Sequence, residues 1–164
     1  MNNRYVLETL RELIAVRRDC EQGFARCAEY VHNEALRKIF MVHAHECAEA
    51  LHQLEELVRS LGAEANGERS TLLLARRASP QCWASVASDE DEQILEECEC
   101  GTSRVLEAYR NALDDPLPDP VREVLLRQFE GAVSGHDQIR ELAAVQNPVP
   151  RGRAKGAGAA AGLE

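Results

Sequence analysis

The sequence predicts an all-α four-helix bundle with a long, partly helical connection between the second and third helices. Hydrophobic residues make up 45% of the 164 residues but aromatic residues only 4%, and such an aliphatic core suits helix-on-helix packing. Apolar side chains recur at helical spacing through four long segments, which are joined by two short connections and one long middle connection. A chain of this length folds as one domain, which we place at residues 1–146.

The first helix is expected over residues 3–31. Gly23 lies in the middle of this helix, where glycine is about 1 kcal/mol less favourable than alanine. Its lack of a side chain would permit a close contact at this point. Arg17 interrupts the apolar face of this helix. The rest of that face consists of Val6, Leu10, Leu13, Cys20, Phe24, Cys27 and Val31.

The second helix is expected over residues 34–61, directly after a two-residue connection. Asn33 is a favourable N-cap, and Gly62 is a favourable residue just beyond the last turn. A connection this short makes the first two helices antiparallel neighbours. His43 and Cys47 occupy core positions on the apolar face, although neither is a plain hydrophobic residue. Why a core helix carries an imidazole and a thiol one turn apart is the functional question that this sequence raises.

The long connection covers residues 63–88. It is too long for a tight turn and too apolar for a disordered linker, so we expect it to pack along the bundle. A short helix is expected at residues 72–77, before Pro80 interrupts the pattern. Trp83 is expected to anchor the connection as a hydrophobic side chain.

The third helix is expected to start within the acidic segment 88–92 and to end near Leu113. Asp119 is predicted to cap the fourth helix, with Pro120 at its first position. From residue 147 onwards the chain is rich in Pro, Gly and Ala without apolar periodicity. Residues 147–164 are therefore predicted to be a disordered tail.

Charge and composition exclude several classes of partner. The formal net charge is −9 and the isoelectric point is about 5.1, so the surface repels nucleic acid and anionic lipid. No apolar run approaches the roughly 20 residues of a membrane span, and the N-terminus has no continuous apolar segment of a signal peptide. The protein is therefore expected in the cytoplasm, where its cysteines would be reduced: Cys20, Cys27, Cys47, Cys82, Cys98 and Cys100.

Several short strings resemble one family of proteins. They are ILEECECG at 94–101, AYRNAL at 108–113 and RQFEGAVSGHDQIREL at 127–142, together with the upstream tryptophan segment. Over residues 4–144 the chain resembles a family of bacterial ferritin-like four-helix-bundle proteins of unknown function. The resemblance implies a ferritin-like bundle. This family typically has Gly-Glu-Asp where this chain has Gly101-Thr102-Ser103, so the chain lacks an acidic residue at an inward position.

A ferritin-like di-iron centre needs inward-facing Glu-x-x-His pairs, and the sequence contains one textual match, Glu49-x-x-His52. On a helix, both residues point about 140° away from Cys47 and the apolar face. They are predicted to lie on the surface. A di-iron oxidase is disfavoured for this reason.

A different set of polar residues is predicted to face the core at one level of the bundle. If the third helix runs parallel to the second, all four helices contribute to this layer, and thiolate and imidazole ligands suit Zn²⁺ or iron. The candidate metal ligands are His43, Cys47, Cys98 and His136, and the candidates that flank them are Cys20, Glu21, Glu46 and Glu97.

The polar layer also has an explanation without metal. Arg17 lies one turn from Cys20 and can form an ion pair with Glu21, Glu46 or Glu97. Buried cysteine is also a common small hydrophobic residue, and Cys20 beside Arg17 is the only pair suited to a redox-sensitive thiol.

Two functions therefore stay open. One is a metal-binding protein, or a protein linked to metal or redox stress, that acts through the Cys/His layer. The other is a non-catalytic structural or interaction module that self-associates into a homo-oligomer or binds a protein partner. The sequence contains no catalytic triad and no glycine-rich phosphate loop, so it indicates no enzymatic activity.

Overall fold

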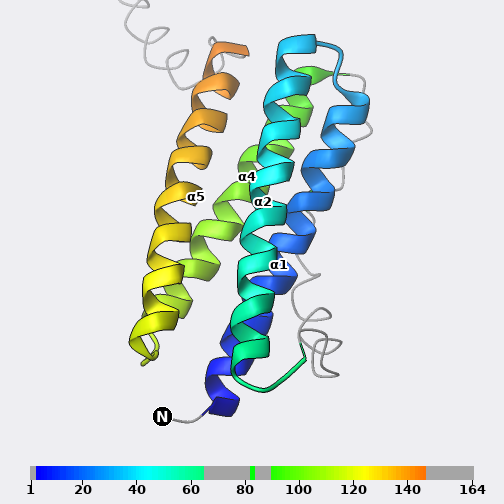
Figure 1. The fold of residues 1–164 in the computed structure, drawn as a ribbon. Coiled ribbons are helices and arrows are strands. Elements are labelled where there is room, and N and C mark those ends of the chain that lie inside the picture. The colour runs from blue at the N-terminus through cyan, green and yellow to red at the C-terminus, as the bar shows by residue number, and fades with distance from the viewer. Residues whose placement is uncertain (1–2, 65–81, 84–89, 147–164) are drawn as a thin grey trace, which may run out of the picture.

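The computed structural model describes residues 3–64, 82–83 and 90–146 of the chain (Figure 1). This described part is helical and contains no strand, which confirms the predicted all-α four-helix bundle. Its helices are α1 (Asn3–Tyr30), α2 (Glu34–Ser60), α4 (Asp91–Leu113) and α5 (Asp119–Gln146).

The helices form two antiparallel hairpins, α1–α2 and α4–α5, that pack through α1 and α4 (Figure 1). At one end, the Asp91 carboxylate accepts hydrogen bonds from the backbone N–H groups of His32 and Asn33, at 2.8 and 2.9 Å. At the other end, Tyr5 Oη donates to Asp115 Oδ1 at 2.8 Å. Since α1 and α4 are antiparallel, α2 and α4 run in the same direction, as the hypothesis of a single polar layer requires. By contrast, α2 and α5 make few contacts.

The helix ends follow the predicted signals closely. The Asn33 side chain accepts from the backbone N–H of Leu36, which confirms the N-cap of α2. Gly62 has a positive φ of 83° just after α2, a conformation that glycine adopts without strain. Asp119 is the first residue of α5 instead of its cap, a shift of one position. The expected short helix at 72–77 and the disordered tail lie outside the described residues.

Trp83 anchors the long connection against α1 and α4. Its ring packs edge-on against Phe24, with 5.3 Å between ring centroids. The backbones of Gly23 and Gly101 form the slot for the indole, because a Cβ atom at either glycine would overlap the indole ring. The expected close contact at Gly23 is thus a contact with tryptophan.

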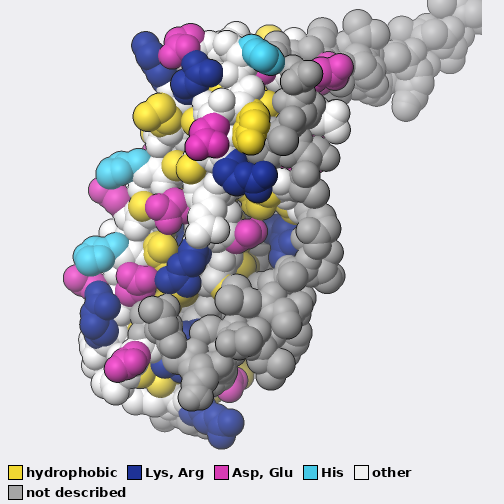
Figure 2. All heavy atoms as spheres, turned by 90° about the vertical axis from the view of Figure 1, so that its right-hand side faces the viewer, with side chains coloured by type: hydrophobic (Ala, Val, Ile, Leu, Met, Phe, Trp, Pro, Cys, Tyr) yellow, Lys and Arg dark blue, Asp and Glu magenta, His cyan; other side chains and the backbone are white. Residues whose placement is uncertain are grey.

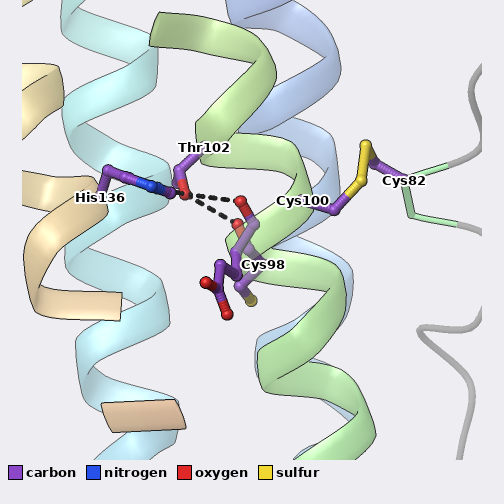
Figure 3. The surroundings of a disulfide bond; sticks show 6 residues. Cys82, Cys98, Cys100, Thr102 and His136 are labelled. Carbon is purple, nitrogen blue, oxygen red and sulfur yellow. Dashed lines mark hydrogen bonds between the residues drawn. A yellow bond between two sulfur atoms is a disulfide. The ribbon is translucent and has the colours of Figure 1, made fainter. Parts of the chain in front are cut away.

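A disulfide joins Cys82 to Cys100, so the prediction that all six cysteines are reduced is wrong for this pair. Figure 3 shows that Cys98 and Cys100 point to different sides of α4 and that Cys100 faces Cys82. The docking of Trp83 brings its neighbour Cys82 alongside α4, with 5.4 Å between the two Cα atoms. The other four cysteines are free and buried.

Removing this disulfide is expected to lower the free energy of unfolding by about 3 kcal/mol, because the bridge closes a loop with a sequence separation of 18. Urea unfolding of Cys100→Ser and of the wild type, both without reductant, measures the loss of unfolding free energy. Adding dithiothreitol should lower the wild-type midpoint and leave that of Cys100→Ser where it is. Coincident curves for the two proteins would show that the bond contributes nothing.

The surface carries charged side chains of both signs (Figure 2). Figure 2 shows basic and acidic side chains interspersed over one side of the molecule. None of the helices within residues 3–64 and 90–146 is long and apolar enough to cross a membrane.

Candidate functional site

A cavity of about 550 Å³ lies at the centre of the bundle, and all four helices line it. Its lining residues on α1 and α4 are buried, whereas several of those on α2 and α5 are exposed. The cavity therefore opens to solvent between α2 and α5, the neighbouring helices that contact each other least. The buried floor consists of Arg17, Cys20, Phe24, Thr102 and Val105.

The small side chains of α5 explain why this space is not filled. The segment GAVSG at 131–135 presents glycine, alanine and serine where a bundle helix usually presents leucine. A Cβ atom at Gly131 would contact nothing within 4 Å, whereas one at Gly135 would lie 3.1 Å from His43 Cε1. α5 thus approaches α2 closely at Gly135 and leaves open space one turn earlier.

Arg17 is the buried cation of the cavity, with 7% of its surface exposed. Its Nε donates to Tyr109 Oη at 3.0 Å, and its Nη1 donates to Cys47 Sγ at 3.6 Å. Burial opposes the charge, but Tyr109 and Cys47 outweigh burial and the pKa of Arg17 lies above its ordinary value. The expected ion pair between Arg17 and a glutamate is absent among the described residues, since a tyrosine and a thiol take its place.

A chain of hydrogen bonds holds the guanidinium in position. Tyr109 Oη accepts from Arg17 and donates to Gln128 Oε1 at 2.6 Å. Gln128 Nε2 in turn donates to the backbone oxygen of Ala50 at 3.2 Å and to Gln53 Oε1 at 2.9 Å. Residues of α1, α4, α5 and α2 are linked in this way, so the cation has a defined place although it lies in the core.

Cys47 and Cys20 form a coupled pair of thiols beside this cation. A hydrogen bond from Cys20 and the nearby charge of Arg17 lower the pKa of the Cys47 thiol to about 7, against the effect of burial. The same hydrogen bond, together with burial, raises the pKa of Cys20 well above its ordinary value. Cys47 is therefore the thiolate of the pair and Cys20 the protonated donor. The sequence suggested Cys20 as the thiol beside Arg17, but the guanidinium contacts Cys47.

Two histidines lie at the same cavity, His43 on α2 and His136 on α5. His43 stacks on Phe24, with 4.9 Å between ring centroids, and its Nε2 lies 2.7 Å from Gln138 Oε1. His136 Nδ1 lies 2.7 Å from Thr102 Oγ1 (Figure 3). Burial and the charge of Arg140 lower the pKa of His136, so its imidazole is neutral at pH 7.

The structure brings together only part of the predicted metal-ligand set. His43, Cys47 and His136 line the cavity, as do the flanking candidates Cys20 and Glu46. The remaining candidates, Cys98, Glu21 and Glu97, do not line it. Within the described residues, no group of three or more His, Cys, Asp or Glu side chains is arranged to hold a metal ion.

Cys98 pairs with a different thiol. Its Sγ lies 3.6 Å from Cys27 Sγ, and both cysteines are fully buried between α1 and α4. Burial and the hydrogen bond to Cys27 raise the pKa of Cys98 well above its ordinary value. The Cys27–Cys98 pair does not line the cavity, and Arg17 contacts Cys47 instead.

The Glu-x-x-His match lies on the outer part of α2. The His52 side chain is 65% exposed and lies 3.2 Å from Glu56, and Glu49 lies 3.2 Å from His45. Glu49 also lies at the rim of the cavity, although the sequence predicted only that it lies on the surface.

Sequence reasoning missed the supporting residues of the site. Thr102, Tyr109 and Gln128 lie on apolar faces of their helices, and this polar character at buried positions was the available signal. The run of small residues on α5 was a second signal. Neither signal identifies which partner a side chain meets.

The family comparison covers most of the chain. Residues 5–115 match the family described as a domain of unknown function, DUF2383, and this region spans α1, α2 and α4. α5 lies beyond the matched residues. No curated protein matches the chain. Because the match extends over more than half of the sequence, the chain belongs to the DUF2383 family.

Proposed function

We propose that this protein is a thiol-based redox protein in which Cys47 reacts with hydroperoxides and Cys20 resolves the product. The observation that carries the proposal is the position of Cys47 on the wall of an open cavity, between a second thiol and a buried guanidinium. A reactive thiol needs a stabilised thiolate, access for its oxidant and a nearby partner. Cys47 has all three.

The reaction uses two thiols and one hydroperoxide. The Cys47 thiolate attacks the distal oxygen of the hydroperoxide, the O–O bond breaks, and the leaving alkoxide takes a proton to become an alcohol. Cys47 is then a sulfenic acid. The Cys20 thiol loses its proton as its sulfur attacks that of Cys47, and water leaves as the disulfide forms. Two electrons pass from the thiols to the peroxide, and an external dithiol restores the reduced pair.

The Cys27–Cys98 pair is an internal control for this chemistry. Its sulfur atoms lie 3.6 Å apart, but it has no neighbouring cation among its described contacts and does not line the cavity. Equimolar hydrogen peroxide is expected to oxidise Cys20 and Cys47 to a disulfide while Cys27 and Cys98 stay reduced. Peptide mapping by mass spectrometry without reductant identifies both pairs in one sample.

The variant Cys20→Ser tests the two roles. Without a resolving thiol, Cys47 should accumulate as a sulfenic acid that dimedone traps, whereas Cys47→Ser should leave Cys20 unmodified. Oxidation of Cys27 and Cys98 at the same rate as Cys47 would refute the proposal. The closeness of two thiols would then account for their reactivity without the cavity or Arg17.

A second candidate function is the binding of a thiophilic metal ion such as Zn²⁺ or Fe²⁺ in the same cavity. It is favoured by the convergence of Cys20, His43, Cys47 and His136 on one cavity. A ferritin-like bundle, which the parallel course of α2 and α4 supports, commonly holds metal between its helices. The side chains would need to turn inward, since they are not arranged as a ligand set now.

Cobalt substitution separates this candidate from the thiol function. Thiolate-bound Co²⁺ gives an intense charge-transfer absorption, which should disappear in Cys47→Ala and persist in Cys98→Ala, since Cys98 is not at the cavity. Protein purified without a nickel column should then contain stoichiometric metal. A chain that neither peroxide nor metal affects would instead be a non-catalytic interaction module.

A further inference from the structure

The cavity has the size and shape of a small-molecule site. Its volume of about 550 Å³ lies within the roughly 300–1,000 Å³ of ligand pockets and far exceeds ordinary packing voids. Gly131 lines the cavity at its exposed side, and an added Cβ atom there would contact nothing within 4 Å. A hydroperoxide as small as hydrogen peroxide needs only a small part of this space.

Arg17 supplies the charge that such a ligand would meet. Nε and Nη1 are used by Tyr109 and Cys47, whereas Nη2 makes no hydrogen bond with any described residue. Arg17 lines the cavity and keeps 7% of its surface exposed, so Nη2 is the guanidinium nitrogen left for a ligand. Cys47 supplies part of the counter-charge for this buried cation, and an incoming carboxylate would supply more.

The remaining walls restrict the class of anion. Phe24, Val105 and Ala132 give the cavity an apolar surface beside the guanidinium. Glu46 and Glu49 lie at its rim and repel anions that carry more than one charge. We propose that the cavity binds a small monocarboxylate, with its carboxylate on Arg17 Nη2 and its apolar body against these three side chains.

This site shares the cavity with the thiol pair but does not depend on the peroxide reaction. The carboxylate and the Cys47 thiolate compete for one guanidinium. A bound monocarboxylate therefore suppresses the reactivity of Cys47, and removal of the Cys47 sulfur leaves the guanidinium to the ligand.

Calorimetric titration of the full chain with sodium hexanoate tests the ligand class. Hexanoate is expected to bind at one site. Hexanol, which has the same apolar body without the charge, is expected to bind at least about tenfold more weakly. Inorganic phosphate, which lacks the apolar body, is expected to be weaker as well. Equal affinities for hexanol and hexanoate overturn the role of Arg17, and tighter binding of phosphate overturns the monocarboxylate class.

Substitutions on α5 test the location without touching the charged groups. Gly131→Leu places a bulky side chain at the mouth of the cavity and is expected to weaken hexanoate binding about tenfold or more, whereas the matched control Gly131→Ala changes it by less than about threefold. Both variants should fold, since glycine is the weaker helix former. Unchanged affinity in Gly131→Leu overturns the cavity as the binding site.

Two further variants separate this inference from the proposed function. Arg17→Met is expected to abolish hexanoate binding, and Cys47→Ala to retain or tighten it. Hexanoate binding without any peroxide reactivity contradicts the thiol function alone. Peroxide reactivity without hexanoate binding contradicts the monocarboxylate site alone.

Discussion

Arg17→Met is expected to slow the alkylation of Cys47 by iodoacetamide at pH 7 by about tenfold or more. The hydrogen bond from Cys20 and the charge of Arg17 together lower the pKa of Cys47 to about 7, so about half of this thiol is ionised at neutral pH in the wild type. Without the guanidinium, the pKa of Cys47 rises, because one of the two groups that lower it is gone while burial still opposes ionisation. Each further unit lowers the thiolate fraction about tenfold. Mass spectrometry of the Cys47 peptide measures the rate between pH 5 and 10.

The pH profile separates lost charge from lost access. The variant should reach the wild-type rate at high pH, because the same thiolate then forms in the same cavity, and Arg17→Lys should lie between the two proteins. Methionine has a similar length and no charge, so the core can accommodate it. If the alkylation rate is lower at every pH and the midpoint of the profile is unchanged, the variant has closed or distorted the cavity.

Gly101→Ala is expected to lower the free energy of unfolding by about 2 kcal/mol, even though alanine is the better helix former. Its methyl group would overlap the six-membered ring of Trp83, which fills the slot between Gly101 and Gly23. Trp83 is the single tryptophan of the chain, so its fluorescence should also move to longer wavelength as the indole leaves the slot. Urea unfolding followed by fluorescence and by circular dichroism measures both effects.

Gly131→Ala is the matched control for this prediction. It makes the same chemical change in a helix but meets no atom within 4 Å, so it should raise stability by up to about 1 kcal/mol. If Gly101→Ala stabilises the protein to the same extent and the tryptophan emission is unchanged, the slot is not a tight fit.

The arrangement of the helices could be predicted from local signals. Asn33 and Gly62 mark the ends of α2 because capping depends on a few neighbouring residues, and the structure confirms both. The short connection at 31–33 correctly made α1 and α2 neighbours. Trp83 was expected to anchor the connection and does so against Phe24. These features follow from residue type and spacing alone.

The contacts of the site depend on distances that periodicity does not determine. The predicted polar layer placed Cys20 and Cys47 at one level, and they do interact, but it also placed Cys98 and His136 together, and they do not. Cys98 faces Cys27 on α1 because it lies on the side of α4 that packs there, whereas His136 meets Thr102. A helical face spans about 100°, so sharing a face does not decide which neighbour a side chain contacts.

The disulfide was missed for a similar reason. Cys82 lies in the irregular connection, where no period predicts the direction of a side chain, and its pairing with Cys100 follows from the docking of Trp83. The assumption of a reducing compartment then led to the wrong prediction that Cys82 and Cys100 are reduced.

The proposed thiol chemistry and the proposed ligand selectivity lie on different hairpins of this bundle. The α1–α2 hairpin carries Arg17, Cys20 and Cys47, whereas α5 supplies the small-residue wall that leaves room beside them. Since α2 and α5 make few contacts, changes in the wall need not disturb the thiol pair. Substitutions at residues 131–135 would then change which molecules reach the cavity while leaving the thiol pair in place.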